Sequence, residues 1–141
     1  MMLLASYVAT DAGMSWSFAG TSTKKGGRYE LVGKELRGEV AFFVAPKGGF
    51  DAEKLYRSDT QRTKEADASK GFTHVVKKGI LAGMPAILSD QRYLWDGAAV
   101  ASRCVYATKG NRAWVVRLWW PPKSTGAKAS EELLKSFRFL K

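Results

Sequence analysis

The sequence predicts an α+β domain, because stretches with the two-residue period of β-strands outnumber two segments with a helical pattern. The clearest strand pattern lies between Asp96 and Pro122, where apolar side chains alternate with small or basic ones. One helical segment follows Phe50, and the other closes the chain. With 141 residues, 45% of them hydrophobic, the chain is long enough for one core and too short for two ordinary domains. We therefore expect one α+β domain over residues 13–141, preceded by an N-terminal segment over residues 1–12.

The N-terminal segment leaves two interpretations open. Its apolar run MMLLASYVA lacks the basic start of a secretory signal, and it is far shorter than the roughly 20 residues that cross a bilayer. It is either a clipped signal remnant or a first β-strand. The first interpretation favours the cell envelope or export, and the second favours the cytoplasm.

Three short strands are expected before the first helix. Residues 13–20, GMSWSFAG, alternate large apolar with small residues, and a glycine ends the pattern. The polar stretch TSTKKGG that follows is predicted to be an exposed loop. Residues 28–32 and 38–45 predict two further strands, which are separated by a turn and ended by a proline.

The stretch FDAEKLYRSDTQRTKEADASK predicts a polar helix in the middle of the chain. It contains no run of β-branched residues, and Asp51 is suited to cap its N-terminus. Because its strong apolar side chains are only Phe50, Leu55 and Tyr56, we expect the helix to lie on the body along a narrow stripe. The rest of its surface would be solvated and charged.

The second half of the chain predicts a three-stranded antiparallel meander. The strand FTHVVKKGI and a turn containing Gly and Pro lead into the first meander strand, AILSDQRYLW. Asp96-Gly97 is a strong hairpin signal, and the strands AAVASRCVYA and RAWVVRLWW follow it around the turn TKGN. After two prolines, the C-terminal segment predicts a helix capped by Ser124 or Thr125. Its inward-facing side chains would be Ala129, Leu133, Leu134 and Phe137.

The last meander strand raises the question of a binding face. Trp114 and Trp120 point to one side of it, and Arg117 and Trp119 point to the other. Because helices cover one face of such a sheet, we assign Trp114 and Trp120 to the core. The opposite face would carry Arg117 and Trp119, joined across the strands by Arg103. An arginine beside an exposed aromatic side chain can bind an acidic partner or stack on a nucleic-acid base. It can equally form a cation–π pair that only keeps the sheet face solvated.

Residues suited to catalysis or metal binding are sparse. Cys104 is the only cysteine, which excludes an internal disulfide and leaves a Cys-based metal site without partners; its strand context predicts a buried thiol. His74 is the only histidine, which excludes a His-rich metal site. The glycines lack the spacing of a phosphate-binding loop. We therefore expect no catalytic residue, no cofactor and no bound metal, and a protein that is not an enzyme.

The chain is strongly basic. It has 23 Lys and Arg against 13 Asp and Glu, a formal net charge of +10 at pH 7, which attracts phosphates, anionic lipid and acidic protein surfaces. The basic residues are scattered, with doublets only at Lys24-Lys25 and Lys77-Lys78, and scattered charge is weaker evidence for nucleic acid than a cluster. The sequence thus favours an acidic protein partner, with nucleic acid or an anionic membrane surface as the alternative.

Four motifs, in order, resemble proteins with the PsbP/DcrB-like fold. GMSWSFAGTS resembles their opening strand and turn, and GILAGMPA their central Gly-x-Pro turn, although Ala19 stands where proline is common in the opening. YATKGNRAWVVRL resembles their Gly-Asn-Arg hairpin, and ASEELLKSFRFL their closing helix. The likeness covers residues 13–140. It implies an antiparallel sheet of about six or seven strands with a mid-chain helix and a C-terminal helix packed on it.

The resemblance implies no common catalytic residue. Proteins with the PsbP/DcrB-like fold serve as extrinsic subunits of the photosynthetic oxygen-evolving complex, as a Ran-binding nuclear transport factor, as envelope lipoproteins and as secretion chaperones. It therefore implies an accessory or adaptor domain without catalytic activity. We expect Arg117→Glu to weaken partner binding with little loss of thermal stability. The partner-binding residues are expected on the sheet face and the polar helix: Arg103, Arg117, Trp119, Arg57 and Arg62.

Overall fold

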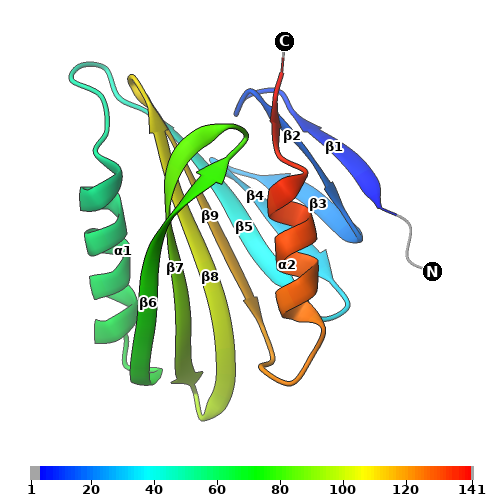
Figure 1. Cartoon of the computed structure of the whole chain (residues 1–141), viewed down its shortest axis with the longest axis vertical. Helices are drawn as coiled ribbons and strands as arrows, with labels where there is room; N and C mark the ends of the chain where they lie inside the picture. The colour runs from blue at the N-terminus through cyan, green and yellow to red at the C-terminus, as the bar shows by residue number, and fades with distance from the viewer. Residues whose placement is uncertain (1–3, 141) are drawn as a thin grey trace.

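The computed structural model describes residues 4–140, and over this range the chain forms ten strands and two helices (Figure 1). The helices are α1 (Ala52–Glu65) and α2 (Gly126–Lys135). The strands are β1 (Ala5–Ala9), β2 (Met14–Phe18), β3 (Gly20–Lys25), β4 (Arg28–Gly33), β5 (Arg37–Val44), β6 (Ser69–Leu81), β7 (Met84–Trp95), β8 (Ala98–Lys109), β9 (Arg112–Trp120) and β10 (Arg138–Phe139).

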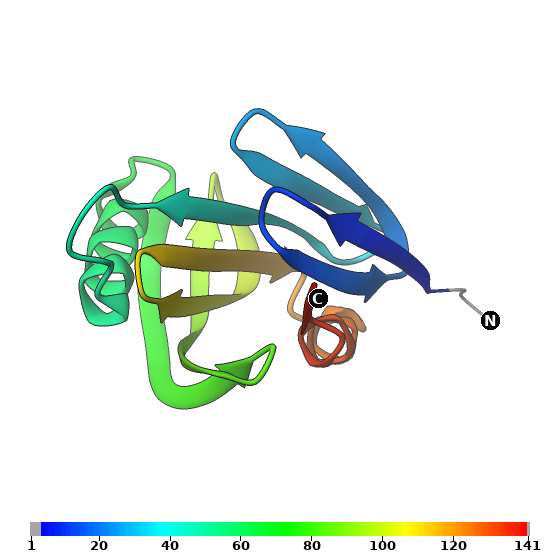
Figure 2. The same cartoon turned by 90° about the horizontal axis from the view of Figure 1, so that it is seen from above.

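The strands form two antiparallel sheets. The larger sheet has seven strands in the order β3-β4-β5-β9-β8-β7-β6, and the smaller has the order β1-β2-β10. The predicted meander is confirmed as β7, β8 and β9, with β6 paired to its outer side. Figure 2 shows α1 and α2 on different sides of the larger sheet. The predicted α+β class, with a mid-chain and a C-terminal helix on a seven-stranded sheet, is confirmed.

The main core lies on one face of the larger sheet, which we call the α2 face. Trp114 and Trp120 of β9 are buried there, as predicted, with side chains of α2 and of the smaller sheet. Trp114 Nε1 donates to the carbonyl of Ala12 at 2.8 Å, which satisfies the one polar atom of its ring. Trp16 of β2 stacks on Phe137 with ring centroids 5.2 Å apart. The small sheet and α2 therefore close this face of the larger sheet.

The opposite face, which we call the α1 face, has a smaller core. Cys104, Tyr106 and Val115 are buried there against Leu55 and Tyr56 of α1. Asp51 caps the helix, as predicted, because its side chain accepts a hydrogen bond from the Glu53 amide at 2.9 Å. The helix packs mainly over β6, β7 and β8. The part of this face that β3, β4 and β5 contribute is left outside its cover.

Two segments differ from the sequence prediction. The predicted loop TSTKKGG forms most of β3, which pairs with β4 along its whole length from Gly20↔Gly33 to Lys25↔Arg28. As the last strand of the sheet, β3 is mostly exposed and needs no apolar alternation. The predicted closing helix ends at Lys135, because Arg138 and Phe139 pair with β2 as β10. The opening run forms β1 from Ala5, and residues 1–3 lie outside the described range.

Candidate functional site

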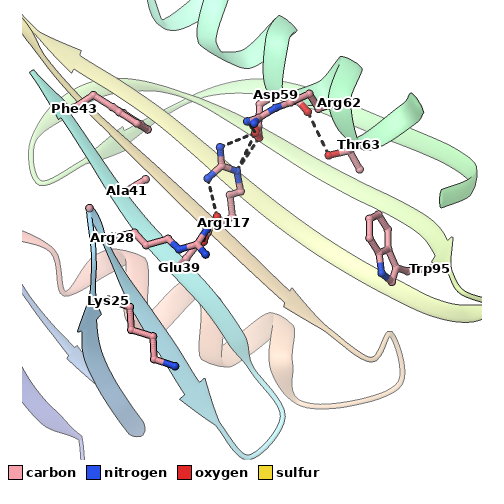
Figure 3. Close-up of a pocket in the computed structure, with 11 residues that line it drawn as sticks. Lys25, Arg28, Glu39, Ala41, Phe43, Asp59, Arg62, Thr63, Trp95 and Arg117 are labelled. Carbon is pink, nitrogen blue, oxygen red and sulfur yellow. Dashed lines mark hydrogen bonds and ion pairs between the residues drawn. The ribbon is translucent and has the colours of Figure 1, made fainter. Parts of the chain in front are cut away.

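A network of charged side chains lies between α1 and the centre of the larger sheet (Figure 3). Arg117 of β9 donates from Nη2 to Asp59 Oδ1 of α1 at 2.6 Å, and from Nε to the same oxygen at 2.9 Å. Its Nη1 donates to Glu39 Oε1 of β5 at 2.8 Å, and the Tyr106 hydroxyl donates to Asp59 Oδ2. The Asp59 side chain is 9% exposed and that of Arg117 is 21% exposed. These bonds hold the middle of α1 against the sheet.

The electrostatics of this network make it a permanent ion pair. Burial disfavours the charge on Asp59, but hydrogen bonds from Arg117 and Tyr106 outweigh it and hold the pKa of Asp59 below its usual value. Burial also disfavours the charge on Arg117, yet Asp59 outweighs it and raises the pKa of the guanidinium. Burial raises the pKa of the Tyr106 hydroxyl. Asp59 and Arg117 thus stay charged near neutral pH, which suits an anchor rather than a proton-transfer pair.

A groove of about 670 Å³ lies beside this network, between α1 and strands β3 to β5 (Figure 3). The network lines its inner part through Glu39, Asp59 and Arg117. Two aromatic side chains line it further out: Phe43 is 40% exposed and Trp95 is 42% exposed. The remaining lining includes three basic residues, Lys25, Arg28 and Arg62. The groove thus combines cations with exposed aromatic surface.

The basic residues of the groove are paired with carboxylates. Arg28 Nη1 lies 3.1 Å from Glu39 Oε2, and Lys25 Nζ lies 3.5 Å from Glu30 Oε1. Arg62 Nη2 lies 3.0 Å from Asp59 Oδ1. These cations are each more than half exposed, so solvent screens the pairs and leaves their charges accessible to a partner. The groove therefore presents charges of both signs.

Aromatic side chains continue from the groove along the α1 face. Tyr93 stacks on Phe72 with ring centroids 5.9 Å apart, and it meets Trp95 edge to face at 6.2 Å. Trp119 lies on the same face of the sheet, since it alternates with Leu118 of the opposite face, and it is 38% exposed. Its partner in register on β5 is the exposed Arg37. An exposed surface of tryptophan and arginine thus adjoins the groove.

The predicted site residues do not all share one surface. Arg117 and Trp119 lie on one face, as predicted, but Arg103 lies on the other. Arg103 pairs in register with the core residue Leu118, and paired residues of an antiparallel sheet point to the same side. Its guanidinium donates to Asp90 Oδ1 at 2.6 Å and to Ser130 Oγ of α2 at 3.3 Å. The prediction that Arg103 joins Arg117 and Trp119 across the strands is wrong.

The three remaining predicted arginines differ in solvent exposure. Arg57 and Arg62 of α1 have side chains that are 74% and 73% exposed; Arg57 pairs with Glu53 at 3.2 Å, and Arg62 lines the groove. Arg117 is enclosed by two carboxylates instead of standing open on a free face. Contrary to the expectation from the sequence, Arg117→Glu should therefore lower thermal stability, because it breaks the bonds to Asp59 and Glu39. The binding roles of these side chains stay predictions.

Several groove residues have little or no signal in the sequence. The pattern places Lys25 in an expected loop and Arg28 at the start of an expected strand, and it links neither residue to the polar helix. Asp59 had a usable signal, because it follows Leu55 and Tyr56 at helical spacing and so shares their inward stripe. Phe43 and Trp95 gave no such signal, since their neighbours in space come from distant segments.

The isolated cysteine and histidine take no visible part in this surface. Cys104 is buried, as predicted, and burial raises the pKa of its thiol to about 11. His74 Nε2 shares a hydrogen bond of 3.0 Å with the Tyr56 hydroxyl, beneath α1. Within residues 4–140, no group of three or more His, Cys, Asp or Glu is placed to hold a metal ion. No helix in the same range is both long and apolar enough to cross a membrane.

Comparisons by sequence and by structure give different results. No protein-family model matches the sequence, and no curated protein is significantly similar to it. The solution structure of cyanobacterial PsbP (CyanoP) from Synechocystis is similar, with a TM-score of 0.71 and 11% identity over 99% of this chain and 94% of that one. The chain has a PsbP-like fold. The resemblance seen in the sequence is thereby confirmed at the level of the fold.

Two bacterial crystal structures also share the PsbP-like fold. One, from Bacteroides thetaiotaomicron, has a TM-score of 0.66 and 16% identity. The match covers 100% of this chain but only 50% of the Bacteroides chain. The other, a protein of unknown function from Pseudomonas aeruginosa, has a TM-score of 0.53 and 14% identity over 86% of this chain and 85% of that one. At such identities the likeness concerns the fold, which hosts more than one function.

Proposed function

We propose that this protein is a non-catalytic accessory domain that binds an acidic surface of a protein partner. The binding surface is the uncovered part of the α1 face, which we call the open α1 face. The observation that carries the proposal is the groove beside α1, where exposed aromatic and basic side chains occur together. The surface consists of Lys25, Arg28, Arg37, Phe43, Trp95 and Trp119.

The residue types of this surface support a protein partner. Tryptophan, tyrosine and arginine are enriched among the residues that contribute most to the affinity of protein interfaces. Trp95 and Trp119 each expose about two fifths of their area, and Arg28 and Arg37 lie on the same sheet face. Their burial by a partner would supply apolar contact, while the arginines would pair with its carboxylates.

The distribution of charge favours a protein over nucleic acid. Glu30 and Glu39 lie among the groove cations and are paired with them. A nucleic acid would bring phosphates against these carboxylates, whereas a protein partner can offer charges of both signs. The PsbP-like fold supports an accessory role as well, because the group that the sequence resembles includes subunits and adaptors without a common catalytic residue.

The anchored helix prepares the groove for binding. Arg117 bonds Asp59 of α1 and Glu39 of β5 at once, so one side chain fixes both walls of the groove. A surface that is already ordered pays less conformational entropy when a partner binds. Arg117 therefore acts as a positioning residue, and the contacts with the partner come from the exposed side chains around it.

The proposal is tested by comparing three tagged forms of the protein as bait in an extract of its native cells. Arg37→Glu reverses a charge on the open α1 face, and Lys128→Glu makes the same change on the exposed side of α2. Proteins retained by each bait are quantified by mass spectrometry, with and without nuclease treatment. A circular dichroism melt confirms that each variant is folded.

We expect the wild type and Lys128→Glu to retain a common partner that Arg37→Glu loses, irrespective of nuclease. Equal retention by all three forms would contradict the assignment of this face. Loss of every retained protein after nuclease treatment would show that nucleic acid, the alternative ligand, mediates the binding.

A further inference from the structure

The outer strand of the larger sheet, β6, leaves one edge unpaired. It is 13 residues long, and among the strands of residues 4–140 it pairs only with β7, so it ends the seven-stranded sheet (Figure 1). Within residues 4–140, no backbone hydrogen bond joins residues 70–81 to a segment other than β7. An edge strand directs half of its N–H and C=O groups outward, where they are available to another strand. The pairing with β7 is regular from residue 73 to residue 81, beyond an irregularity between Lys70 and Thr73.

This regular stretch exposes apolar side chains on both faces. Val75 is 67% exposed, Val76 is 41% exposed and Ile80 is 71% exposed. The hairpin of β6 and β7 curls away from α1 in both views, so the helix does not cover this end of the strand (Figures 1 and 2). An edge that is long, exposed and apolar is a site where another chain can add a strand.

The charge of β6 determines which chain is suited to that edge. The strand carries Lys70, Lys77 and Lys78, and its range Ser69–Leu81 contains no Asp or Glu. Lys77 already lies 3.2 Å from Asp90 Oδ2 of β7, whereas Lys70 and Lys78 are exposed. A second copy of this chain would bring the same lysines to the pairing, and like charges across strands are destabilising. A segment with carboxylates would pair with them.

We propose that β6 accepts an extended, acidic segment of a partner protein as an additional strand along residues 73–81. The main-chain groups of the segment pair with the outward groups of β6, and its acidic side chains lie beside Lys78. Its apolar side chains lie on the other face and cover Val75. This edge lies on a different strand from those that form the groove, so the proposal holds or fails independently of the open α1 face.

The test uses two labelled peptides of equal length and charge with the purified protein. One alternates Glu and Val, and the other alternates Glu and Pro, which removes every second amide proton and favours the polyproline II conformation. Affinity is measured by fluorescence anisotropy at low and physiological salt. Amide hydrogen exchange, read by mass spectrometry, locates the binding on the chain. Lys78→Glu tests the charge at the edge, with Lys128→Glu as its matched control and Arg37→Glu as a control for the open α1 face.

We expect the Glu–Val peptide to slow exchange within β6 and to bind at least about tenfold tighter than the Glu–Pro peptide, since strand pairing needs its amides. Lys78→Glu should weaken that binding about fivefold, as expected for one exposed charge pair, while both control variants leave it unchanged. Equal binding of the two peptides, no binding, or protection outside β6 would overturn the proposal. Concentration-dependent protection of β6 in the protein alone would overturn it too, because the occupant would then be a second copy.

Discussion

Replacing Arg117 by methionine removes the positive charge that holds α1 against the sheet. The change deletes three hydrogen bonds to Asp59 and one to Glu39, and it leaves two carboxylates without their shared partner. Breaking a buried ion pair by removing one member costs about 3 to 5 kcal/mol. Asp59 keeps its bonds from Tyr106 and Arg62, and the Arg117 side chain is 21% exposed, which puts the expected loss at the lower end. We predict a loss of about 3 kcal/mol in the free energy of unfolding.

Urea unfolding followed by tryptophan fluorescence measures this loss, and a thermal melt gives a second reading. For a chain of this size, about 3 kcal/mol corresponds to a melting temperature lower by roughly 6 to 12 °C. Arg57→Met is the matched control, because it makes the same substitution in an exposed pair that contributes at most about 0.5 kcal/mol. If both variants lie within about 0.5 kcal/mol of the wild type, the network does not anchor α1 and the reasoning is refuted.

Three further predictions concern the core and its titration. Folding lowers the pKa of Asp59, so the stabilisation that its carboxylate gives the fold is complete above the unfolded pKa of about 3.9 and is lost as the pH falls through the folded pKa. Asp59→Asn should therefore make the free energy of unfolding, measured by urea titration, decline less steeply toward pH 2. Cys104 should react slowly with a thiol reagent at pH 8 and rapidly once urea unfolds the protein, because burial raises the thiol pKa to about 11; fast reaction of the native protein would contradict this. Gly38→Ala should lower the unfolding free energy by about 1 to 3 kcal/mol or more, since its Cβ would lie 2.3 Å from the Arg117 carbonyl oxygen; a variant as stable as wild type in the same assay would exclude this close approach.

The elements with a strong local pattern were predictable from the sequence. Apolar alternation and the Asp96-Gly97 turn predicted the meander, and the structure shows that turn with positive φ at both residues. Asp51 predicted the start of α1, since a side-chain cap acts within one turn of the chain. The burial of Trp114 and Trp120 followed from alternation along one strand. Each of these inferences depended on neighbours in sequence.

The elements that depend on distant partners were not predictable in the same way. The polar strand β3 has no apolar signal of its own, and its pairing with β4 determines its conformation. The alternation of side chains assigns the residues of one strand to the two faces of the sheet. Only the register between strands determines which residues of neighbouring strands share a face. Arg103 pairs with Leu118 and not with Arg117, so it points to the α2 face.

The candidate site combines both kinds of information. The sequence singled out Arg117, Trp119 and the polar helix, but the groove exists only because β3, β4 and β5 fold beside α1. The carboxylates Glu39 and Asp59 convert Arg117 from a free cation into an anchor. These contacts join residues that are 58 and 78 positions apart, which no local pattern reports.

Photo-crosslinking in the native cell tests most directly whether the open α1 face binds a protein. A photoreactive phenylalanine analogue replaces Trp119 in one form and Val8 in another; Val8 is 59% exposed on β1 and lies on the smaller sheet. We predict a discrete protein adduct from position 119 and none from position 8, with the cross-linked segment of the partner rich in Asp and Glu. Equal products from both positions, or adducts to nucleic acid instead of protein, would contradict the account.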